Sequence, residues 1–249
     1  MTTEFLDQGV ITACTCGNNV FFQRCTVNDI DLLVCENCHT AHQYLPNWTE
    51  KQIEEFYQSF YHTTEQVKIG CTEYKDRYDH DCRISQIRLN AYADYIKPAA
   101  KLLDIGSSNS AFVHVARSRG IDSIGIEMGL DIGDDAVTIR GNIKDSDLAE
   151  NSFDFITLHD VIEHIVDPLA VLEKIKYICR PDGILIIDLP NYWTEAGRHH
   201  WRPVQHLWYW NEDQMCEVLE AVGFNIIKVV EPIPGKLVFY AINKKENII

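Results

Sequence analysis

From residue 99 onward, short apolar runs alternate with segments in which apolar side chains recur every three or four residues. Runs of this length indicate buried strands, and the longer periodic segments indicate helices with one buried face. The pattern predicts strands at 102–105, 123–127, 153–158 and 183–189, and helices at 111–119, 168–178 and 211–222. Such alternation implies an α/β fold, with a mostly parallel sheet and helices on both of its faces.

The end of the chain departs from this alternation. Gly223 ends the last predicted helix as a left-handed cap, and two further strands follow at 225–230 and 236–242. Only residues 231–235 separate these strands, which is too short for the crossover that parallel neighbours need. We therefore expect the last two strands to form an antiparallel hairpin.

The first 98 residues have a different pattern. Residues 1–45 contain short β-prone runs among cysteines, whereas residues 46–98 are polar and aromatic, with apolar side chains at helical spacing. The spacing predicts one helix that starts near Thr49 and a second helix at 81–96. We predict a small β domain at 1–45, a helical connector or lid at 46–98, and a larger α/β domain at 99–249.

Composition is typical of a globular protein. Of the 249 residues, 46% are hydrophobic, and no apolar run reaches the roughly 18 residues that span a bilayer. The N-terminus lacks the basic and apolar regions of a signal peptide, so we expect a cytoplasmic location. The net charge of −15 opposes contact with phosphate backbones, which favours a small-molecule partner over nucleic acid. These features do not fix the oligomeric state.

Cysteines are concentrated at the N-terminus, where five of the nine lie within the first 38 residues. An odd number of cysteines without a signal peptide indicates thiols or a metal site rather than disulfides. Two closely spaced pairs can supply the four thiolates of a structural zinc site in a ribbon. The predicted zinc ligands are Cys14, Cys16, Cys35 and Cys38. The alternatives are a site in which Cys25, His39 or His42 replaces one of them, or unligated buried thiols.

A ligand-binding loop is predicted at 104–110, between a strand and a helix, because ligands in such sheets bind at the carboxyl ends of strands. Gly106 lets the backbone approach a ligand, and Asp104 can accept a hydrogen bond from a cationic amino group. Glu127 ends the next strand, where a carboxylate can hold both hydroxyls of a ribose. The alternatives are a nicotinamide enzyme or a structural turn. Ser108 and Ser110 replace later glycines of the dinucleotide motif, and the terminal hairpin is unusual for dinucleotide folds.

Three segments resemble motifs of class I S-adenosylmethionine-dependent methyltransferases. They are residues 102–127, 153–168 and 180–191, and the resemblance extends over about 99–242. It implies a Rossmann-like seven-stranded sheet with the last strand reversed, and S-adenosylmethionine as the cofactor. The implied cofactor-binding residues are Asp104, Gly106, Ser107, Ser108, Glu127, Met128, Asn142, Ile143 and His159.

The resemblance also assigns roles within this set. Asp104 and Gly106 fall at the methionine end of the cofactor and Glu127 at the ribose. Asn142 falls where relatives often carry an Asp that holds the adenine amino group, and an amide oxygen can accept the same bond. His159 is expected beside the cofactor, after the fourth strand.

Asp160, Glu163 and His164 are spaced so that one helical turn would point all three the same way. In one interpretation Glu163 and His164 are structural, and in a second His164 or His159 is a general base. A third interpretation is a divalent metal site. The segment resembles the E-x-x-E-H motif of ubiquinone-biosynthesis O-methyltransferases and of small-RNA terminal methyltransferases. The latter pair that motif with a histidine stretch similar to 205–211, which adds His206 as a ligand for Mg, Mn or Zn.

The N-terminal half is similar to that of bacterial sugar C-methyltransferases, in which a ribbon and a helical segment help to cover the acceptor. This similarity suggests that several tyrosines line the acceptor pocket, and the alternative is that they pack in the core. The tyrosines concerned are Tyr57, Tyr61, Tyr74 and Tyr78. Residues 198–202, which are rich in Arg and His, are expected either to roof the pocket or to form a solvated loop.

Together these features predict a methyltransferase that acts on a small polar acceptor, such as a nucleotide-linked sugar or a related metabolite. One alternative is a metal-assisted methyltransferase acting on RNA ends, for which RNA binding would depend on salt. Another is a zinc-ribbon binding module whose larger domain holds the cofactor without turnover.

Overall fold

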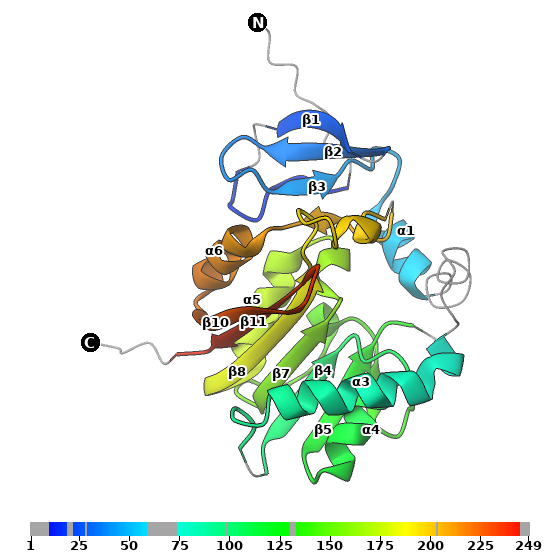
Figure 1. Cartoon of the computed structure of the whole chain (residues 1–249), viewed down its shortest axis with the longest axis vertical. Coiled ribbons are helices and arrows are strands. Elements are labelled where there is room, and N and C mark those ends of the chain that lie inside the picture. The colour runs from blue at the N-terminus through cyan, green and yellow to red at the C-terminus, as the bar shows by residue number, and fades with distance from the viewer. Residues whose placement is uncertain are drawn as a thin grey trace, which may run out of the picture.

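The protein consists of a large α/β body with a smaller β-sheet packed on one end (Figure 1). The structure is a computed structural model, and it describes residues 10–18, 22–27, 29–58, 74–97, 99–129, 133–202 and 204–244. Within the described part of the chain, no helix is both long enough and apolar enough to traverse a lipid bilayer.

The large sheet has seven strands in the order β10-β11-β8-β7-β4-β5-β6. The strands are β4 (Lys101–Ile105), β5 (Asp122–Glu127), β6 (Thr138–Arg140), β7 (Phe153–His159), β8 (Cys179–Pro190), β10 (Asn225–Ile233) and β11 (Lys236–Ile242). Neighbouring strands from β6 through β8 are parallel, and β11 is antiparallel to both β8 and β10. This confirms the predicted Rossmann-like sheet with its reversed last strand. The periodicity missed β6, which is only three residues long.

Helices cover both faces of this sheet because its strands alternate their side chains between the two sides. On one face, Leu102, Phe155 and Tyr240 pack against α3 (Tyr78–Ala91) and α4 (Ala111–Ser118). On the other, Leu103, Ile156 and Phe239 pack against α5 (Pro168–Ile178) and α6 (Glu212–Val222). Figure 1 shows α3 crossing in front of the sheet.

Local capping explains where several helices begin and end. Asn211 and Gln214 form a reciprocal capping box at the start of α6, and Gly223 ends it with φ +95°. Thr49 and Gln52 make the same box at α1 (Glu50–Glu55), as the sequence predicted. The predicted helix at 81–96 is observed as α3, which starts three residues earlier and ends at Ala91.

The small sheet contains a strand that the sequence did not reveal. Its order is β1-β2-β3-β9, with β1 (Phe22–Val27), β2 (Ile30–Cys35), β3 (Ala41–Gln43) and β9 (Trp208–Tyr209). The last strand, β9, comes from the C-terminal part of the chain and pairs with β3, where Trp208 lies opposite His42. Ile11 and Leu45 also belong to the same apolar core as the α5 side of the large sheet. The N-terminal sheet and the large sheet are therefore joined by both a strand and a core.

Candidate functional site

The loop after β4 carries the glycine on which the predicted cofactor site depends. Gly106 has φ +71°, and a β-carbon there would overlap Cγ2 of Val161. Both the conformation and the close packing of Val161 exclude a side chain at this position, and the residue lies on the wall of the cavity. The amides of Gly106 and Ser107 donate to the carbonyl of Ile126 at 2.9 and 3.2 Å, which fixes the loop to β5.

Two serines further along the loop adopt the left-handed conformation that glycine adopts most easily. Ser108 has φ +49° and Ser110 has φ +63°. For a residue with a side chain this conformation costs about 1–2 kcal/mol. At Ser110 local bonds offset the cost, since its hydroxyl bonds to that of Thr138 at 2.8 Å and accepts from the amide of Asp134 at 2.9 Å. The serines therefore keep a glycine-like backbone path.

Glu127 ends β5 and braces the same loop. Its Oε2 accepts from the amide of Ser108 at 2.7 Å, and its Oε1 accepts from the amide of Gly129 at 2.8 Å. The side chain is buried but lies on the wall of the cavity described next. A carboxylate oxygen has more than one lone pair, so a carboxylate that fixes a loop can also accept bonds from a ligand.

A cavity of about 580 Å³ extends along the carboxyl ends of β4, β5 and β7. Such a volume is typical of small-molecule sites. All nine predicted cofactor residues lie on its wall: Asp104, Gly106, Ser107, Ser108, Glu127, Met128, Asn142, Ile143 and His159. The hydroxyls of Ser107 and Ser108 are buried, with no hydrogen-bond partner among the described residues. Both oxygens are closed off from the cavity, and that of Ser107 lies against Gly125 of β5, so these two residues contribute their backbone to the wall.

One end of the cavity carries apolar side chains. Ile53 of α1 and Ile143 of the short turn η3 (Ile143–Asp145) are buried, and Met128 also lies on the cavity wall. Asn142 caps η3, and its Oδ1 accepts from the amide of Lys144 at 3.0 Å. The amide oxygen that we expected at the adenine amino group thus already accepts a backbone bond.

Asp104 and His159 form a buried pair at the adjoining edge of the sheet. Asp104 Oδ1 accepts from the Thr157 hydroxyl at 2.7 Å and lies 3.3 Å from Nδ1 of His159. The Tyr92 hydroxyl lies 3.2 Å from Nε2 of His159, and burial raises the pKa of Tyr92, so the hydroxyl stays protonated. Both ring nitrogens of His159 have partners, which suits it to orient Asp104 more than to take a proton from an acceptor.

Four charged residues form a network that the sequence did not reveal as a unit. Arg88 of α3 contacts Asp188 of β8 at 2.8 Å, and Lys236 of β11 lies 3.3 Å from the same carboxylate. Lys236 also pairs with Asp160, whose amide donates to Asp188 at 2.8 Å. Burial would raise the pKa of Asp188, but Arg88 and Lys236 outweigh it and hold the pKa far below its usual range. One signal was available, because Asp188 interrupts the apolar run of β8.

Three of the four predicted ligands for a second metal come together. The ligating atoms of Glu163, His164 and His206 lie within 4.8 Å of one another. Asp160 is not in this group, which corrects the prediction of four ligands. Asp160 has φ +54° and pairs with Lys236, because this left-handed residue precedes the short turn η4 (Ile162–His164) and is not part of it. Asp160 therefore does not share a helical turn with Glu163 and His164.

Glu163 is the least solvated member of this group. Its carboxylate is fully buried, and neither oxygen has a hydrogen-bond partner among the described residues. Burial raises the pKa of Glu163 well above its ordinary value, and neighbouring Asp160 raises it further. His206 is buried as well, and this lowers its pKa well below the usual range. The set fits a cation, because an unpartnered carboxylate beside two imidazoles offers three ligand atoms.

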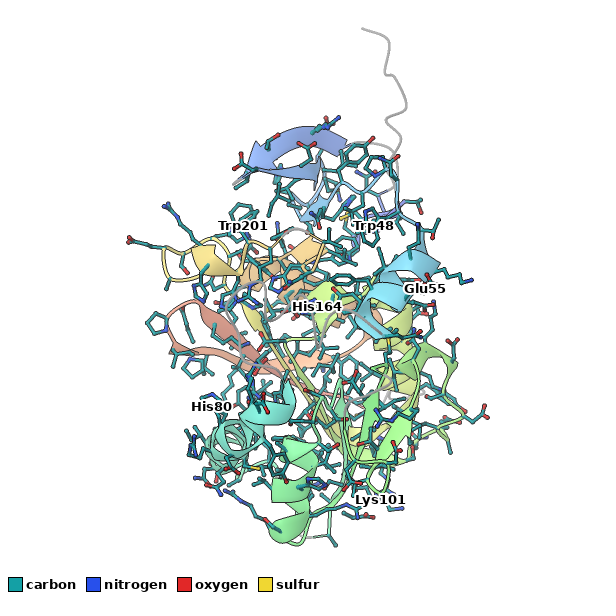
Figure 2. All side chains as sticks on the ribbon, turned by 90° about the vertical axis from the view of Figure 1, so that its right-hand side faces the viewer. Trp48, Glu55, His80, Lys101, His164 and Trp201 are labelled. Atoms are coloured by element: carbon teal, nitrogen blue, oxygen red, sulfur yellow. The ribbon has the colours of Figure 1, made fainter. Side chains whose placement is uncertain are left out.

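The outer partners of the two histidines fix their orientation. Nδ1 of His164 lies 2.6 Å from the carbonyl oxygen of Gln205, so it carries the proton and donates. Nε2 of the same ring faces Glu163, at 4.0 Å from Oε1. The Tyr57 hydroxyl lies 2.9 Å from Nδ1 of His164, and the Tyr192 hydroxyl lies 2.8 Å from Nδ1 of His206. Figure 2 shows His164 near the middle of the molecule.

The remaining predicted pocket residues divide into two groups. His199 and His200 of the turn η5 (Arg198–His200) line the cavity, as does Tyr57. Burial lowers the pKa of His200 to about 4, so this side chain is neutral near pH 7. Tyr78 lies outside the cavity wall, is exposed, and its hydroxyl lies 2.8 Å from Nδ1 of His114. Tyr61 and the side chain of Tyr74 lie outside the described residues.

The four predicted zinc ligands form a compact group at the end of the small sheet. The Sγ atoms of Cys14 and Cys38 are 3.4 Å apart, and those of Cys16 and Cys35 are 3.6 Å apart. A tetrahedron with Zn–S bonds of about 2.3 Å has edges of about 3.8 Å, so the group fits a zinc ion. The set of four does not include Cys25, His39 or His42, the alternatives that the sequence left open.

Comparisons with known proteins agree with the fold. The family model described as a methyltransferase domain matches residues 76–229, which is more than half of the chain. Among curated proteins, the ubiquinone biosynthesis O-methyltransferase of Actinobacillus pleuropneumoniae serotype 7 (strain AP76) is 27% identical over 125 residues. The match covers 41% of this chain and 53% of that protein. The chain therefore spans about half the length of the curated relatives it matches.

Solved structures share the architecture at low sequence identity. An S-adenosylmethionine-dependent methyltransferase from Archaeoglobus fulgidus has a TM-score of 0.54 at 15% identity, covering 71% of this chain and 97% of that one. The cyclase SpnF has a TM-score of 0.55 at 14% identity, covering 66% of this chain and 81% of that one. At such identities the likeness establishes the fold alone, and a cyclase among the neighbours illustrates that one fold hosts several chemistries.

Proposed function

Since this chain belongs to the methyltransferase-domain family, we propose that it transfers the methyl group of S-adenosylmethionine to a small polar acceptor. The observation that carries the proposal is one continuous cavity with two different ends. The loop at Gly106, the Glu127 carboxylate and the apolar end near Ile143 suit the cofactor. The end near Asp160 and Lys236 is polar and suits an acceptor such as a nucleotide-linked sugar or a related metabolite.

The cofactor end offers a partner for the amino group and for the ribose of S-adenosylmethionine. Asp104 is a buried carboxylate at the end of β4 and would accept from the amino group of the methionine part. Glu127, on the cavity wall at the end of β5, would accept from the ribose hydroxyls. In the transfer the acceptor atom forms a bond to the methyl carbon as the sulfonium bond breaks. The acceptor then loses its proton, and alignment of the two molecules supplies much of the rate.

We also propose that Glu163, His164 and His206 hold a divalent ion at the edge of the cavity, on whose wall His164 lies while Glu163 and His206 are buried behind it. Histidines that bind metal usually donate their other ring N–H to a carbonyl or a similar group, and the bond from His164 Nδ1 to Gln205 follows that pattern. Two imidazoles and one carboxylate suit Zn or Mn better than Mg, which prefers oxygen ligands. A bound ion would act as a Lewis acid that lowers the pKa of the acceptor group. The alternative is that His164 is a general base, with Glu163 protonated.

At the end of the small sheet, which with its cysteines forms the ribbon, we propose a structural zinc ion bound by Cys14, Cys16, Cys35 and Cys38. Their spacing supports this, and so do two amide donors, since Asn18 Nδ2 lies 3.4 Å from Cys35 Sγ and Asn37 Nδ2 lies 3.6 Å from Cys16 Sγ. N–H groups directed at sulfur favour the thiolate form that binds metal. With four sulfur ligands the site is closed, so its role is structural rather than catalytic.

The test of the function is calorimetric titration of S-adenosylmethionine into wild type and Glu127→Ala. We expect the variant to bind roughly 10- to 100-fold more weakly, because two charge-assisted hydrogen bonds to the ribose are lost. Glu150→Ala, at an exposed position away from the cavity, should bind like wild type. Equal affinity in Glu127→Ala would reject the assigned site, and absence of binding to wild type would reject the function.

The rival functions have distinct signatures in the same preparations. Salt-dependent binding of RNA would favour the RNA-end methyltransferase. Cofactor binding without turnover on a broad panel of small acceptors would favour a binding module. Methylation of a small acceptor, detected as transfer of a labelled methyl group, would exclude the binding module.

A further inference from the structure

Helix α1 of the N-terminal half forms part of the wall at the apolar end of the cavity. Glu50, Ile53 and Glu54 all lie on that wall, and Ile53 is buried. Two contacts dock the helix onto η3. Lys144 Nζ pairs with Glu50 at 2.8 Å, and Asn142 Nδ2 donates to Glu54 Oε1 at 3.2 Å. A helix distant in sequence thus closes the end of the cavity that suits a nucleoside base.

The chemistry at this end is that of a flat base with one polar edge. Ile53, Ile143 and Met128 provide the apolar surfaces that a base needs. Both polar atoms of the Asn142 amide are engaged, Oδ1 by the amide of Lys144 and Nδ2 by Glu54. The Asn142 bond goes to only one of the two carboxylate oxygens of Glu54. The half-buried Glu54 therefore brings an acceptor group to a wall that carries these apolar side chains and also the Glu50–Lys144 pair.

From this juxtaposition we propose that Glu54 selects the adenine base of the cofactor, accepting a hydrogen bond from its exocyclic amino group while Ile53 packs against the ring. The inference rests on the proposed function, since it assumes that the cavity holds S-adenosylmethionine. Adenine presents a donor at this edge, whereas hypoxanthine presents a carbonyl oxygen. A carboxylate accepts from the first and repels the second, so the contact discriminates between them.

The chain directly after α1 reaches His164. Tyr57 lies two residues beyond Glu55, the last residue of α1, where the helical path continues. The Tyr57 hydroxyl contacts His164, as described above. The segment that contacts the base therefore also touches a ligand of the proposed metal group, and the two roles can be tested separately.

The experiment compares two ligands on four proteins by calorimetry. The ligands are S-adenosylhomocysteine and S-inosylhomocysteine, which carry an amino group and a carbonyl respectively on the base. The proteins are wild type, Glu54→Ala, Asn142→Ala and Glu55→Ala. Wild type should prefer the adenosyl ligand by roughly tenfold or more, and Glu54→Ala should bring this preference within about threefold. Asn142→Ala removes the tether but keeps the carboxylate, so the preference should survive even if both affinities fall.

Glu55→Ala is the matched control. Glu55 is the next residue of α1, is exposed, pairs only with Lys51 at 3.7 Å among the described residues, and is absent from the cavity wall. It should behave like wild type (Figure 2 labels it on the helix). If Glu54→Ala weakens both ligands equally and keeps the preference, Glu54 is a tether only and the inference is overturned. If wild type binds neither ligand, the proposed function itself fails, which is a different result.

Discussion

At the scale of single residues, the most informative side chain is Glu163. A fully buried carboxylate without hydrogen-bond partners is costly as an anion, because the interior solvates charge poorly. Either a proton or a cation must neutralise it, and the two histidines next to it are suited to ligate a cation. The raised pKa of Glu163 expresses the same penalty from burial when no ion is bound. The two possibilities, a protonated Glu163 and a metal-bound Glu163, therefore predict different metal contents when glutamine, a neutral side chain of the same shape, replaces Glu163.

We predict that Glu163→Gln loses about one divalent ion per chain while remaining folded. The amide keeps the shape of the carboxyl group but is a weak metal ligand. Elemental analysis of purified wild type and variant measures the difference, with the ribbon zinc as an internal reference. His200→Gln should keep the ion, because His200 lies near His206 but outside the ligand group. Identical metal content in wild type and Glu163→Gln would support the protonated, structural interpretation.

At the scale of elements, the two-residue strand β9 links the ribbon to the reacting centre. β3 donates from the amide of Gln43 to the carbonyl of Leu207 at 2.7 Å, and the Gln43 side chain accepts from the amide of Val204 at 2.8 Å. Between these contacts lie Gln205, whose carbonyl orients His164, and His206. The small sheet thus holds the segment that supplies the second histidine of the proposed metal group.

We predict that Cys35→Ser removes the ribbon zinc and destabilises the whole protein. Loss of a structural metal at a cost of about 3 kcal/mol lowers Tm by roughly 6–12 °C in a chain of this size. Zinc content and thermal unfolding measure both effects, and tryptophan fluorescence reports on Trp208 beside β3. Cys25→Ser is the control, since Cys25 lies in the same sheet but outside the ligand group. Retention of zinc by Cys35→Ser would contradict the assignment.

At the scale of the whole molecule, the N-terminal and α/β parts unfold as one unit if their shared core determines stability. Ile11, Leu45 and Ile53 belong to one apolar cluster with the α5 side of the large sheet. His42 lies at this junction, fully buried, with its ring 5.3 Å from that of Trp208. Burial lowers the pKa of His42 to about 4, so the folded state keeps this side chain neutral.

The His42 pKa predicts how stability depends on pH. Between pH 6.5 and about 4 the unfolded chain binds a proton at this residue and the folded chain does not. The contribution of neutral His42 to the free energy of unfolding is therefore complete above pH 6.5. Between pH 6.5 and about 4 it falls by about 1.4 kcal/mol for each pH unit of acidification. Urea unfolding at several pH values should show a shallower slope for His42→Gln, by that amount. His80→Gln, at an exposed position, should keep the wild-type slope, and an unchanged slope in His42→Gln would refute the prediction.

The sequence by itself determined the features that depend on near neighbours in the chain. Hydrophobic periodicity predicted six of the strands, the helices on both faces and the terminal hairpin, because burial of one face imposes a period of two or 3.6 residues. The loop at Gly106 and the carboxylate of Glu127 follow from strand ends, which meet at one edge of a parallel sheet. The paired cysteines also come together as predicted, since each pair is local and only two strands separate them.

Only the tertiary structure decided which distant groups meet. Local spacing placed Asp160 with Glu163 and His164. The left-handed backbone conformation of Asp160 instead directs its side chain to Lys236, 76 positions later. The contact of Glu54 with Asn142 and the pairing of β9 with β3 leave no periodic signal either. Such contacts depend on strand register and on how whole helices and strands pack. Packing in turn depends on many side chains at once. The residues of the proposed cofactor site could therefore be predicted from local sequence, whereas the set of residues around the proposed metal group could not.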